Sequence, residues 1–407
     1  MPRELVITGM GVISAIGQGK GDFTNALLSG KSAFDMMRRP GRQRQSAYLG
    51  AEIGDVVFPA QLERRVLRAS SLSAQLALVA LHEAWDEARL HEIDPHRIGL
   101  VIGGSNTQQR ELLQLQNAHQ DRPEFLRPTY GLSFMDTDLC GFCTAQFGIR
   151  GLAFTVGGAS ASGQLAIIQA AQSVVSGQVD VCVALGALTD LSYWECQGFR
   201  ALGAMGSDRY ADQPELACRP FDREHDGFIF GESCGALVIE TRQSSERRSV
   251  DRYASLCGWG VAMDANRNPD PSLDGEVRAI NDALRAAGQQ PSEIDYVNPH
   301  GTGSPLGDET ELRALRRCGL AGVHVNATKS LIGHGLSAAG SVEVIATLLQ
   351  MKEGRLHPSR NLSDPVDPDF NWITETAVDY EITNALTLSM GFGGMNTALI
   401  WRNCQSH

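Results

Sequence analysis

The sequence predicts an α/β fold made of two halves with a similar order of elements, and three observations lead to this prediction. The chain has 407 residues, 43% hydrophobic and 20% charged, which is enough to bury a large core. Short apolar runs flanked by glycine alternate with helical patterns, as is typical of strands buried on both faces of a sheet. This pattern starts again after the charged segment of residues 240–252. We therefore expect a duplication, with one half in residues 1–245 and the other in residues 246–407.

The first half contains five predicted strands with helical patterns between them. The strands are residues 4–12, 97–104, 152–158, 180–187 and 234–240. Between the third and fourth strands, apolar residues recur at helical spacing from Leu165 to Val175. This spacing predicts a helix of about four turns that ends at Gly177, because glycine is common just past a helix C-terminus.

The second half repeats the alternation of strands and helices. Its predicted strands are residues 254–262, 293–301, 323–330, 385–394 and 397–401. Two helical patterns accompany them, at residues 274–288 and 336–354. The same kinds of element in a similar order support the duplication near residue 245.

Charge and composition exclude several classes of protein. A net charge of −12 and a pI near 5.3 argue against nucleic acid as a partner, because phosphate binding needs a basic surface. No apolar run approaches the ~18 residues of a membrane span, and the N-terminus lacks the apolar core of a signal peptide. We expect no membrane segment.

The nine cysteines indicate free thiols in a reducing cytoplasm. Their number is odd, they are scattered, and several lie in apolar runs. Cys140 and Cys143 form a lone C-x-x-C pair without the second pair or the histidines that a zinc site needs. We expect these two residues to be structural, and we expect no metal site.

Ser160 lies in a strand, turn and helix sequence that reads FTVGGASASG. Such a turn can present a nucleophile beside backbone N–H groups and the positive end of a helix. Serine is also a common N-cap residue, so capping alone is the other interpretation.

Two histidines lie in glycine-rich turns that follow apolar strands of the second half. His300 is in YVNPHGTGSPLGD, and His334 is in NATKSLIGHGLSAAG. Ligands of open α/β sheets bind at strand ends, so these turns are candidates for a site that includes Ser160. Lys329 could hold the ring of His334 or could be a solvated or capping lysine. Phe392 lies between glycines in LSMGFGGMNT, which is suited to a mobile side chain or to a plain hairpin turn.

Four blocks of sequence carry a resemblance to a known family. They read ACRPFDREHDGFIFGESCGALVIE, VNPHGTGSPLGDETE, NATKSLIGHGLSAAGSVE and SMGFGGMN. In content and order they resemble the β-ketoacyl-acyl carrier protein synthases of the thiolase superfamily, over nearly the whole chain. The resemblance implies a thiolase-like duplicated α-β-α-β-α sandwich with two central mixed sheets. It also implies a homodimer that uses no cofactor of its own and takes acyl groups from the phosphopantetheine arm of an acyl carrier protein (ACP).

The resemblance assigns roles to the residues of the glycine-rich turns. His300 and His334 match the histidines that assist decarboxylation of a malonyl thioester and hold the developing enolate. Lys329 matches the lysine of the same site. Thr302 and Ser304 match hydroxyl residues that contact the pantetheine arm, with serine in place of a usual threonine at 304.

The last block supplies the remaining candidates. Phe392 matches a gating phenylalanine, and we expect Gly393 and Gly394 of the same turn to contribute to pantetheine binding. Met395 departs from the usual family residue, which suggests a reshaped acyl tunnel.

Ser160 matches the nucleophilic cysteine of the family, so GASASG stands where the family has a cysteine. A serine hydroxyl is a far weaker acid than a thiol and exchanges poorly with thioesters unless a base is positioned for it. Decarboxylation needs only hydrogen-bond donors for the enolate, and both histidines remain. The resemblance therefore implies decarboxylation of malonyl-ACP to acetyl-ACP, as in the serine-bearing family members of polyketide β-branching cassettes.

Two other functions remain open from the sequence. The chain could be a non-catalytic partner of an active synthase, like the chain-length factors, although such partners usually lose the histidines as well. It could also be an acyltransferase that uses Ser160 as an O-acyl carrier activated by His300.

A basic cluster on a predicted helix is a candidate surface for the carrier protein. Arg64, Arg65 and Arg68 lie in QLERRVLRASS, in an otherwise acidic chain. An acidic carrier protein would favour such a cluster, whereas a solvated helix face is the alternative.

Overall fold

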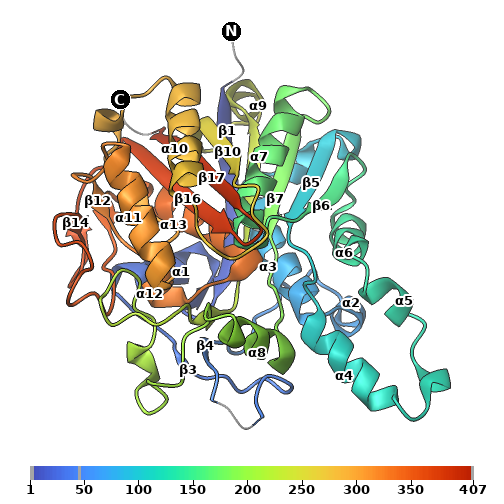
Figure 1. Ribbon diagram of the computed structural model, residues 1–407. Helices are drawn as coiled ribbons and strands as arrows, with labels where there is room; N and C mark the ends of the chain where they lie inside the picture. Colours follow the sequence, from blue (N-terminus) through green and yellow to red (C-terminus); the bar gives the residue numbers. More distant parts are fainter. Residues whose placement is uncertain (1–3, 45–46, 405–407) are drawn as a thin grey trace.

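The computed structural model describes residues 4–44 and 47–404, and a twelve-stranded mixed sheet runs through its centre (Figure 1). The first half contributes five strands in the spatial order β1, β9, β7, β5, β6, and a sixth, the short strand β2, pairs with β1. β7, β5 and β6 run parallel, and β9 runs antiparallel to β1 and β7. Their bounds are β1 Leu5–Ser14, β5 Ile98–Gly103, β6 Ala153–Val156, β7 Val181–Gly186 and β9 Ser233–Thr241.

The second half repeats this order with β10, β17, β16, β11 and β12, and β14 lies outside β12. β16, β11, β12 and β14 run parallel, and β17 runs antiparallel to β10 and β16. The matching order and directions show the internal duplication. The bounds are β10 Ala254–Met263, β11 Tyr296–Asn298, β12 His324–Val325, β14 Asn371–Trp372, β16 Asn384–Gly391 and β17 Met395–Asn403.

The two halves meet where β1 pairs antiparallel with β10. The paired residues are Leu5 with Leu256 and Val6 with Ser255. The two predicted mixed sheets are thus continuous through this one short pairing. The β1–β10 pairing joins the halves in space but does not fix where along the sequence one half ends. A boundary near residue 245 therefore stays a prediction.

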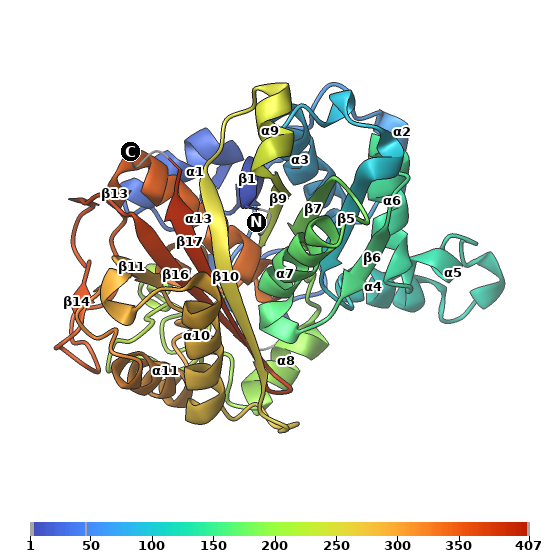
Figure 2. The same ribbon diagram turned by 90° about the horizontal axis from the view of Figure 1, so that it is seen from above.

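Four long helices complete the five layers (Figure 2). α3 (Leu72–Glu87) packs on the outer face of β1 and β9, and α10 (Leu273–Ala287) packs in the same way on β10 and β17. α7 (Ser162–Val175) and α13 (Ala339–Glu353) contact each other and fill the layer between the two halves of the sheet. The α-β-α-β-α sandwich is confirmed.

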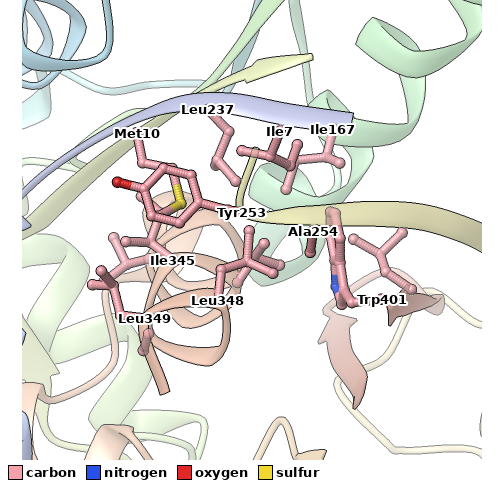
Figure 3. Packing of buried hydrophobic residues seen from close by; sticks show 14 of the residues in the cluster. Ile7, Met10, Ile167, Leu237, Tyr253, Ala254, Ile345, Leu348, Leu349 and Trp401 are labelled. Carbon is pink, nitrogen blue, oxygen red and sulfur yellow. The ribbon is translucent and has the colours of Figure 1, made fainter. Parts of the chain in front are cut away.

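The largest hydrophobic core lies around α7 and α13. Hydrophobic residues of both helices pack against those of β1, β9 and β17. Burial of this apolar surface holds the two halves of the chain together. Figure 3 labels ten of the residues: Ile7, Met10, Ile167, Leu237, Tyr253, Ala254, Ile345, Leu348, Leu349 and Trp401.

The remaining elements form the surroundings of this sandwich. The helices are α1 Gly19–Leu28, α2 Arg64–Ala69, α4 Gln109–His119, α5 Tyr130–Ser133, α6 Thr137–Phe147, α8 Tyr193–Ala201, α9 Arg242–Arg248, α11 Pro305–Arg317 and α12 Lys329–Ile332. The short strands are β2 Gly17–Gln18, β3 Asp35–Met36, β4 Leu49–Ala51, β8 Phe230–Gly231, β13 Arg355–Leu356 and β15 Val378–Asp379. α4 and α5 lie on an arm that extends away from the sandwich in Figure 1, and α5 stands away from it in Figure 2 as well.

Two local predictions are wrong. The strand predicted at 152–158 is the edge strand β6, and Ala153 and Phe154 on it are exposed, so it is not buried on both faces. His334 does not follow its strand directly, because α12 lies between β12 and the His334 turn. Within residues 4–44 and 47–404, no helix combines the length and apolar character that a membrane crossing requires.

Glycines let each outer helix approach its strand closely, and the arrangement is the same in both halves. A Cβ atom on Gly11 of β1 would lie 1.9 Å from Ala80 O of α3. A Cβ atom on Gly260 of β10 would lie 2.0 Å from Ala279 O of α10. These are contacts with backbone, which cannot rotate away, so a methyl group would push helix and strand apart.

We predict that Gly11→Ala and Gly260→Ala each lower the free energy of unfolding by about 1–3 kcal/mol, the usual cost of overpacking a core. Gly21→Ala is the control, because nothing lies within 4 Å of its added Cβ atom and alanine favours a helix such as α1. Denaturant unfolding of the three variants measures the effect. A Gly11→Ala protein as stable as the wild type would contradict the close approach.

Candidate active site

A cavity of about 560 Å³ brings together most of the residues singled out from the sequence. Its wall is shared by both halves: Ser160 comes from the first, and both histidines come from the second. The predicted residues that line it are Ser160, His300, Thr302, Ser304, His334, Phe392 and Gly394. Lys329 and Gly393 are not part of this wall.

Ser160 lies in a single 3₁₀ turn, Ala159–Ala161, directly before α7. Ala159 has a left-handed backbone with φ of 48°, which is unusual for a residue with a side chain and makes the turn sharp. Ser162, rather than Ser160, makes the local hydrogen bonds: its Oγ accepts from Gly158 N at 2.9 Å and donates to Ala159 O at 2.7 Å. Ser160 is half-buried, and its hydroxyl makes no hydrogen bond with the described residues. The interpretation of Ser160 as a capping residue is therefore not supported.

His334 is held with one ring nitrogen free to donate. Its backbone is fixed by Ile229 and Gly231, and Leu336 N donates to His334 Nδ1 at 3.2 Å. Because Nδ1 accepts, the proton of the neutral ring is on Nε2. The edge of the ring packs against Phe228, with centroids 5.2 Å apart. His334 can therefore present an N–H donor to a ligand in the cavity.

His300 lies beside His334 but is held through its backbone. The two ring centroids are 5.4 Å apart, with the rings nearly perpendicular. His300 N donates to Glu311 Oε1 at 2.6 Å, and Lys329 Nζ donates to His300 O. His300 Nδ1 has no hydrogen-bond partner among the described residues. Because His300 lines the cavity, its ring can contact a ligand there.

Both imidazoles are neutral near pH 7. Burial holds the pKa of His300 and of His334 well below the ordinary value, and the positive charge of Lys329 adds to the effect. In the unfolded chain each of these two imidazoles binds a proton below about pH 6.5, and in the folded chain they do not. Acidification through that pH therefore favours unfolding, whereas the rings of the folded protein stay neutral.

The structure corrects the expectation for Lys329. The side chain is buried, and Nζ donates to Glu343 Oε1 at 2.5 Å and to the backbone carbonyl of His300. It neither holds the ring of His334 nor reaches solvent. Burial raises the pKa of Glu343 to about 7, and the Lys329 charge opposes this rise. Lys329 therefore positions the His300 backbone and neutralises a buried carboxylate.

Two buried carboxylates that sequence reasoning missed shape the loop of His300, residues 299–304. Glu311 accepts from His300 N and from Gly301 N, the latter at 2.8 Å. Asp308 accepts from Thr302 N and Gly303 N, both at 3.1 Å. Both carboxylates lie on one face of α11, and their i, i+3 spacing directly after the glycine-rich turn was the available signal.

Phe392 lies at the turn of the hairpin formed by β16 and β17. Gly394 N donates to Gly391 O at 3.1 Å and closes this turn. Phe392 is 40% exposed, and its ring packs near Phe199 at 6.3 Å between centroids. Gly391 allows the hairpin to touch the Ser160 turn, because a Cβ atom there would lie 2.1 Å from Gly158 O. The turn is therefore both a hairpin and part of the site.

Of the residues predicted for pantetheine binding, Thr302, Ser304 and Gly394 line the cavity, and Gly393 does not. Thr302 Oγ1 accepts from Ser304 N at 3.2 Å, and Ser304 precedes the first turn of α11. Gly393 and Gly394 have positive φ of 89° and 88°, which the tight turn requires. Their contact with a pantetheine arm stays a prediction.

The basic cluster and the cysteines lie elsewhere. Arg64, Arg65 and Arg68 lie on or at the start of α2 with exposed side chains, as predicted, and Arg65 has a weak ion pair with Glu63 at 3.8 Å. All nine cysteines are free. Cys140 and Cys143 are buried on α6 in the core beneath α3.

Comparison with known proteins agrees with this geometry. Residues 2–245 match the family described as Beta-ketoacyl synthase, N-terminal domain, and residues 253–363 match Beta-ketoacyl synthase, C-terminal domain. The polyketide biosynthesis malonyl-ACP decarboxylase PksF of Bacillus subtilis (strain 168) is 60% identical over 402 residues, which cover 99% of this chain and 97% of PksF. The 3-oxoacyl-[acyl-carrier-protein] synthase 2 of Staphylococcus aureus (strain COL) is 32% identical over 418 residues, which cover 99% of each chain.

Solved structures match over the full length as well. One is a chain of AntDE:AntF, a type II PKS acyl-carrier protein in complex with its ketosynthase, with a TM-score of 0.88, 27% identity and 100% of both chains covered. Another is a β-ketoacyl synthase from Burkholderia phymatum STM815, with a TM-score of 0.88, 26% identity, and 99% of this chain and 100% of the other covered. Both family matches, both curated relatives and the site thus agree, and the chain belongs to the β-ketoacyl synthase family.

Proposed function

We propose that this chain decarboxylates malonyl-ACP to acetyl-ACP and CO₂ in polyketide biosynthesis. The observation that carries the proposal is a cavity with two neutral histidines and with serine where the family loads its acyl group. The relative that is 60% identical, PksF, is named a malonyl-ACP decarboxylase of polyketide biosynthesis. The narrower expectation of a role in β-branching stays a prediction.

The histidines supply what decarboxylation requires. When the bond to the malonyl carboxylate breaks, its electron pair moves into the thioester, and negative charge collects on the enolate oxygen. Nε2–H of His334 donates to this oxygen, and the ring of His300 lies beside it. Each such donor is worth roughly 2.7–4 kcal/mol when it is positioned in advance. The backbone bonds of His300 to Glu311 and Lys329 provide that positioning.

Serine in place of the nucleophilic cysteine removes the acyl loading that would send the enolate into condensation. A condensing enzyme needs an acyl group on its nucleophile before the enolate forms. Ser160 makes no hydrogen bond with either histidine, so no base is in contact to activate its hydroxyl. This geometry favours decarboxylation over the alternative in which Ser160 carries an acyl ester. The built donor pair likewise argues against a non-catalytic subunit.

The partner in this proposal is an acyl carrier protein. The ketosynthase of the AntDE:AntF structure is in complex with a carrier protein, and that fold covers the whole of this chain. The exposed arginines of α2 are the surface that we assign to the carrier. Exposed Ala153 and Phe154 on the edge strand β6 suit a second copy of the chain, and light scattering would measure the expected homodimer. A cytoplasmic location stays an expectation from the free cysteines.

The role of Ser160 can be tested with two substitutions. Ser160→Ala should keep CO₂ release from malonyl-ACP within roughly tenfold of the wild type, because the histidines and not a nucleophile stabilise the enolate. Ser160→Cys should gain an acyl group from acyl-ACP, because the helix N-terminus lowers a thiol pKa. Gas release and intact-protein mass spectrometry are the measurements. Loss of CO₂ release in Ser160→Ala to background would contradict the proposal and favour the O-acyl carrier.

The carrier surface can be tested by charge reversal. Arg65→Glu with Arg68→Glu should raise the apparent KM for malonyl-ACP, by roughly tenfold at low salt, and leave the KM for a small malonyl thioester unchanged. Arg247→Glu, which reverses an exposed arginine on α9, is the control and should change neither. Steady-state kinetics at two salt concentrations measure the effect. An unchanged KM for malonyl-ACP in the double variant would refute this surface.

A further inference from the structure

Glu276 contributes to the cavity a carboxyl group that neither holds the His300 loop nor pairs with another described side chain. Glu276 lies in the first turn of α10 and lines the same cavity as His300 and His334. Glu276 is only 2% exposed to solvent. The side chain makes no hydrogen bond or ion pair with the described residues, and Oε2 is a buried polar atom without a partner.

The position of Glu276 is fixed by close packing. A Cβ atom on the neighbouring Gly275 would lie 1.8 Å from Asp264 Oδ1 and 2.7 Å from Asn396 Nδ2. The start of α10 therefore presses against the residue that follows β10 and against the base of the Phe392 hairpin. α10 also packs against α11, whose Glu311 accepts the N–H of His300. Glu276 therefore lies on a helix that contacts both the base of the hairpin and the helix that supports the His300 loop.

An unpartnered buried carboxyl group has to be neutral. Leaving an ionised carboxylate without hydrogen bonds in the interior is too costly, so such a group keeps its proton. Burial raises the pKa of Glu276 well above its ordinary value, and the negative charges of Glu311 and Asp264 raise it further. Glu276 therefore carries a proton inside the cavity near neutral pH.

The other carboxylates of the cavity are committed to donors. Asp308 and Glu311 accept backbone N–H groups of the His300 loop. Asp264 Oδ1 accepts from Asn396 Nδ2 at 2.8 Å. Glu195 Oε2 accepts from Ser192 N at 2.8 Å as part of a helix cap. Asp270 also lines the cavity, but it is exposed to solvent. Among the described residues, Glu276 is thus the one buried carboxyl group of the cavity without such a donor.

We propose that the Glu276 carboxyl group delivers the proton that turns the enolate into the acetyl group. This inference rests on the proposed decarboxylation. The O–H bond of Glu276 breaks, a C–H bond forms at the enolate carbon with the electron pair of the enolate, and Glu276 is left as a carboxylate. Water restores its proton after acetyl-ACP leaves. A condensing enzyme has no need of this acid, because there the acyl carbon takes the electron pair.

The test compares Glu276→Gln, which keeps the shape and loses the acid, with Glu276→Asp, which keeps an acid and loses length. Glu276→Gln should lower kcat for acetyl-ACP formation by at least about tenfold with KM within about twofold, because general acids contribute at this scale. Glu276→Asp should keep more activity than Glu276→Gln. Asp274→Asn removes an exposed carboxylate from the same helix turn and is the control with wild-type rates.

Which of the two variants is more active decides whether Glu276 is a proton donor or a structural residue. A purely structural role favours the isosteric glutamine, so a Glu276→Gln protein as active as Glu276→Asp, or within threefold of the wild type, would overturn the inference. Thermal unfolding of each variant shows that it is folded. The wild-type reaction tests the proposed function separately, because failure of the wild type to release CO₂ would refute that function, whatever Glu276 does.

Discussion

The site depends on the close crossing of α7 and α13 at their N-terminal ends. A Cβ atom on Gly163 would lie 2.6 Å from Ser341 N, and one on Gly340 would lie 2.9 Å from Gln164 N. Only glycine allows the two backbones to come so near. Because Ser160 precedes α7 and His334 precedes α13, this contact brings a residue of each half to one cavity. The hydrophobic core around the two helices, shown in Figure 3, keeps the crossing in place.

Charge in the interior is arranged to keep the donors neutral. Lys329 is paired with Glu343 and also donates to the backbone of His300, so its charge lies near both rings and lowers their pKa. A neutral imidazole still carries one N–H group, which can donate to an enolate oxygen. The carboxyl groups that face the same cavity differ in their hydrogen bonds. Asp308 and Glu311 accept backbone N–H groups and build the His300 loop, whereas Glu276, buried without a donor, retains a proton.

Much of this organisation could be predicted from the sequence, and the failures have physical causes. Apolar runs and glycine punctuation predicted most strands, the duplication and the gathering of Ser160, His300 and His334. Periodicity does not say which strand lies at an edge, so the exposed β6 was missed. The spacing of residues along the sequence does not show which side chains meet in the folded chain. The hydrogen bonds of Lys329 and the burial of Glu276 could therefore be found only from the structure. The family resemblance supplied roles, whereas the structure supplied the contacts that support them.

The most direct test of the account uses the wild-type protein and its carrier. After mixing with malonyl-ACP, intact mass spectrometry follows both macromolecules at once. We expect the carrier to lose the mass of one CO₂ while the mass of the protein stays unchanged, because decarboxylation needs the histidines and no acyl enzyme. An acyl group on Ser160, or a malonyl-ACP that remains intact, would contradict it.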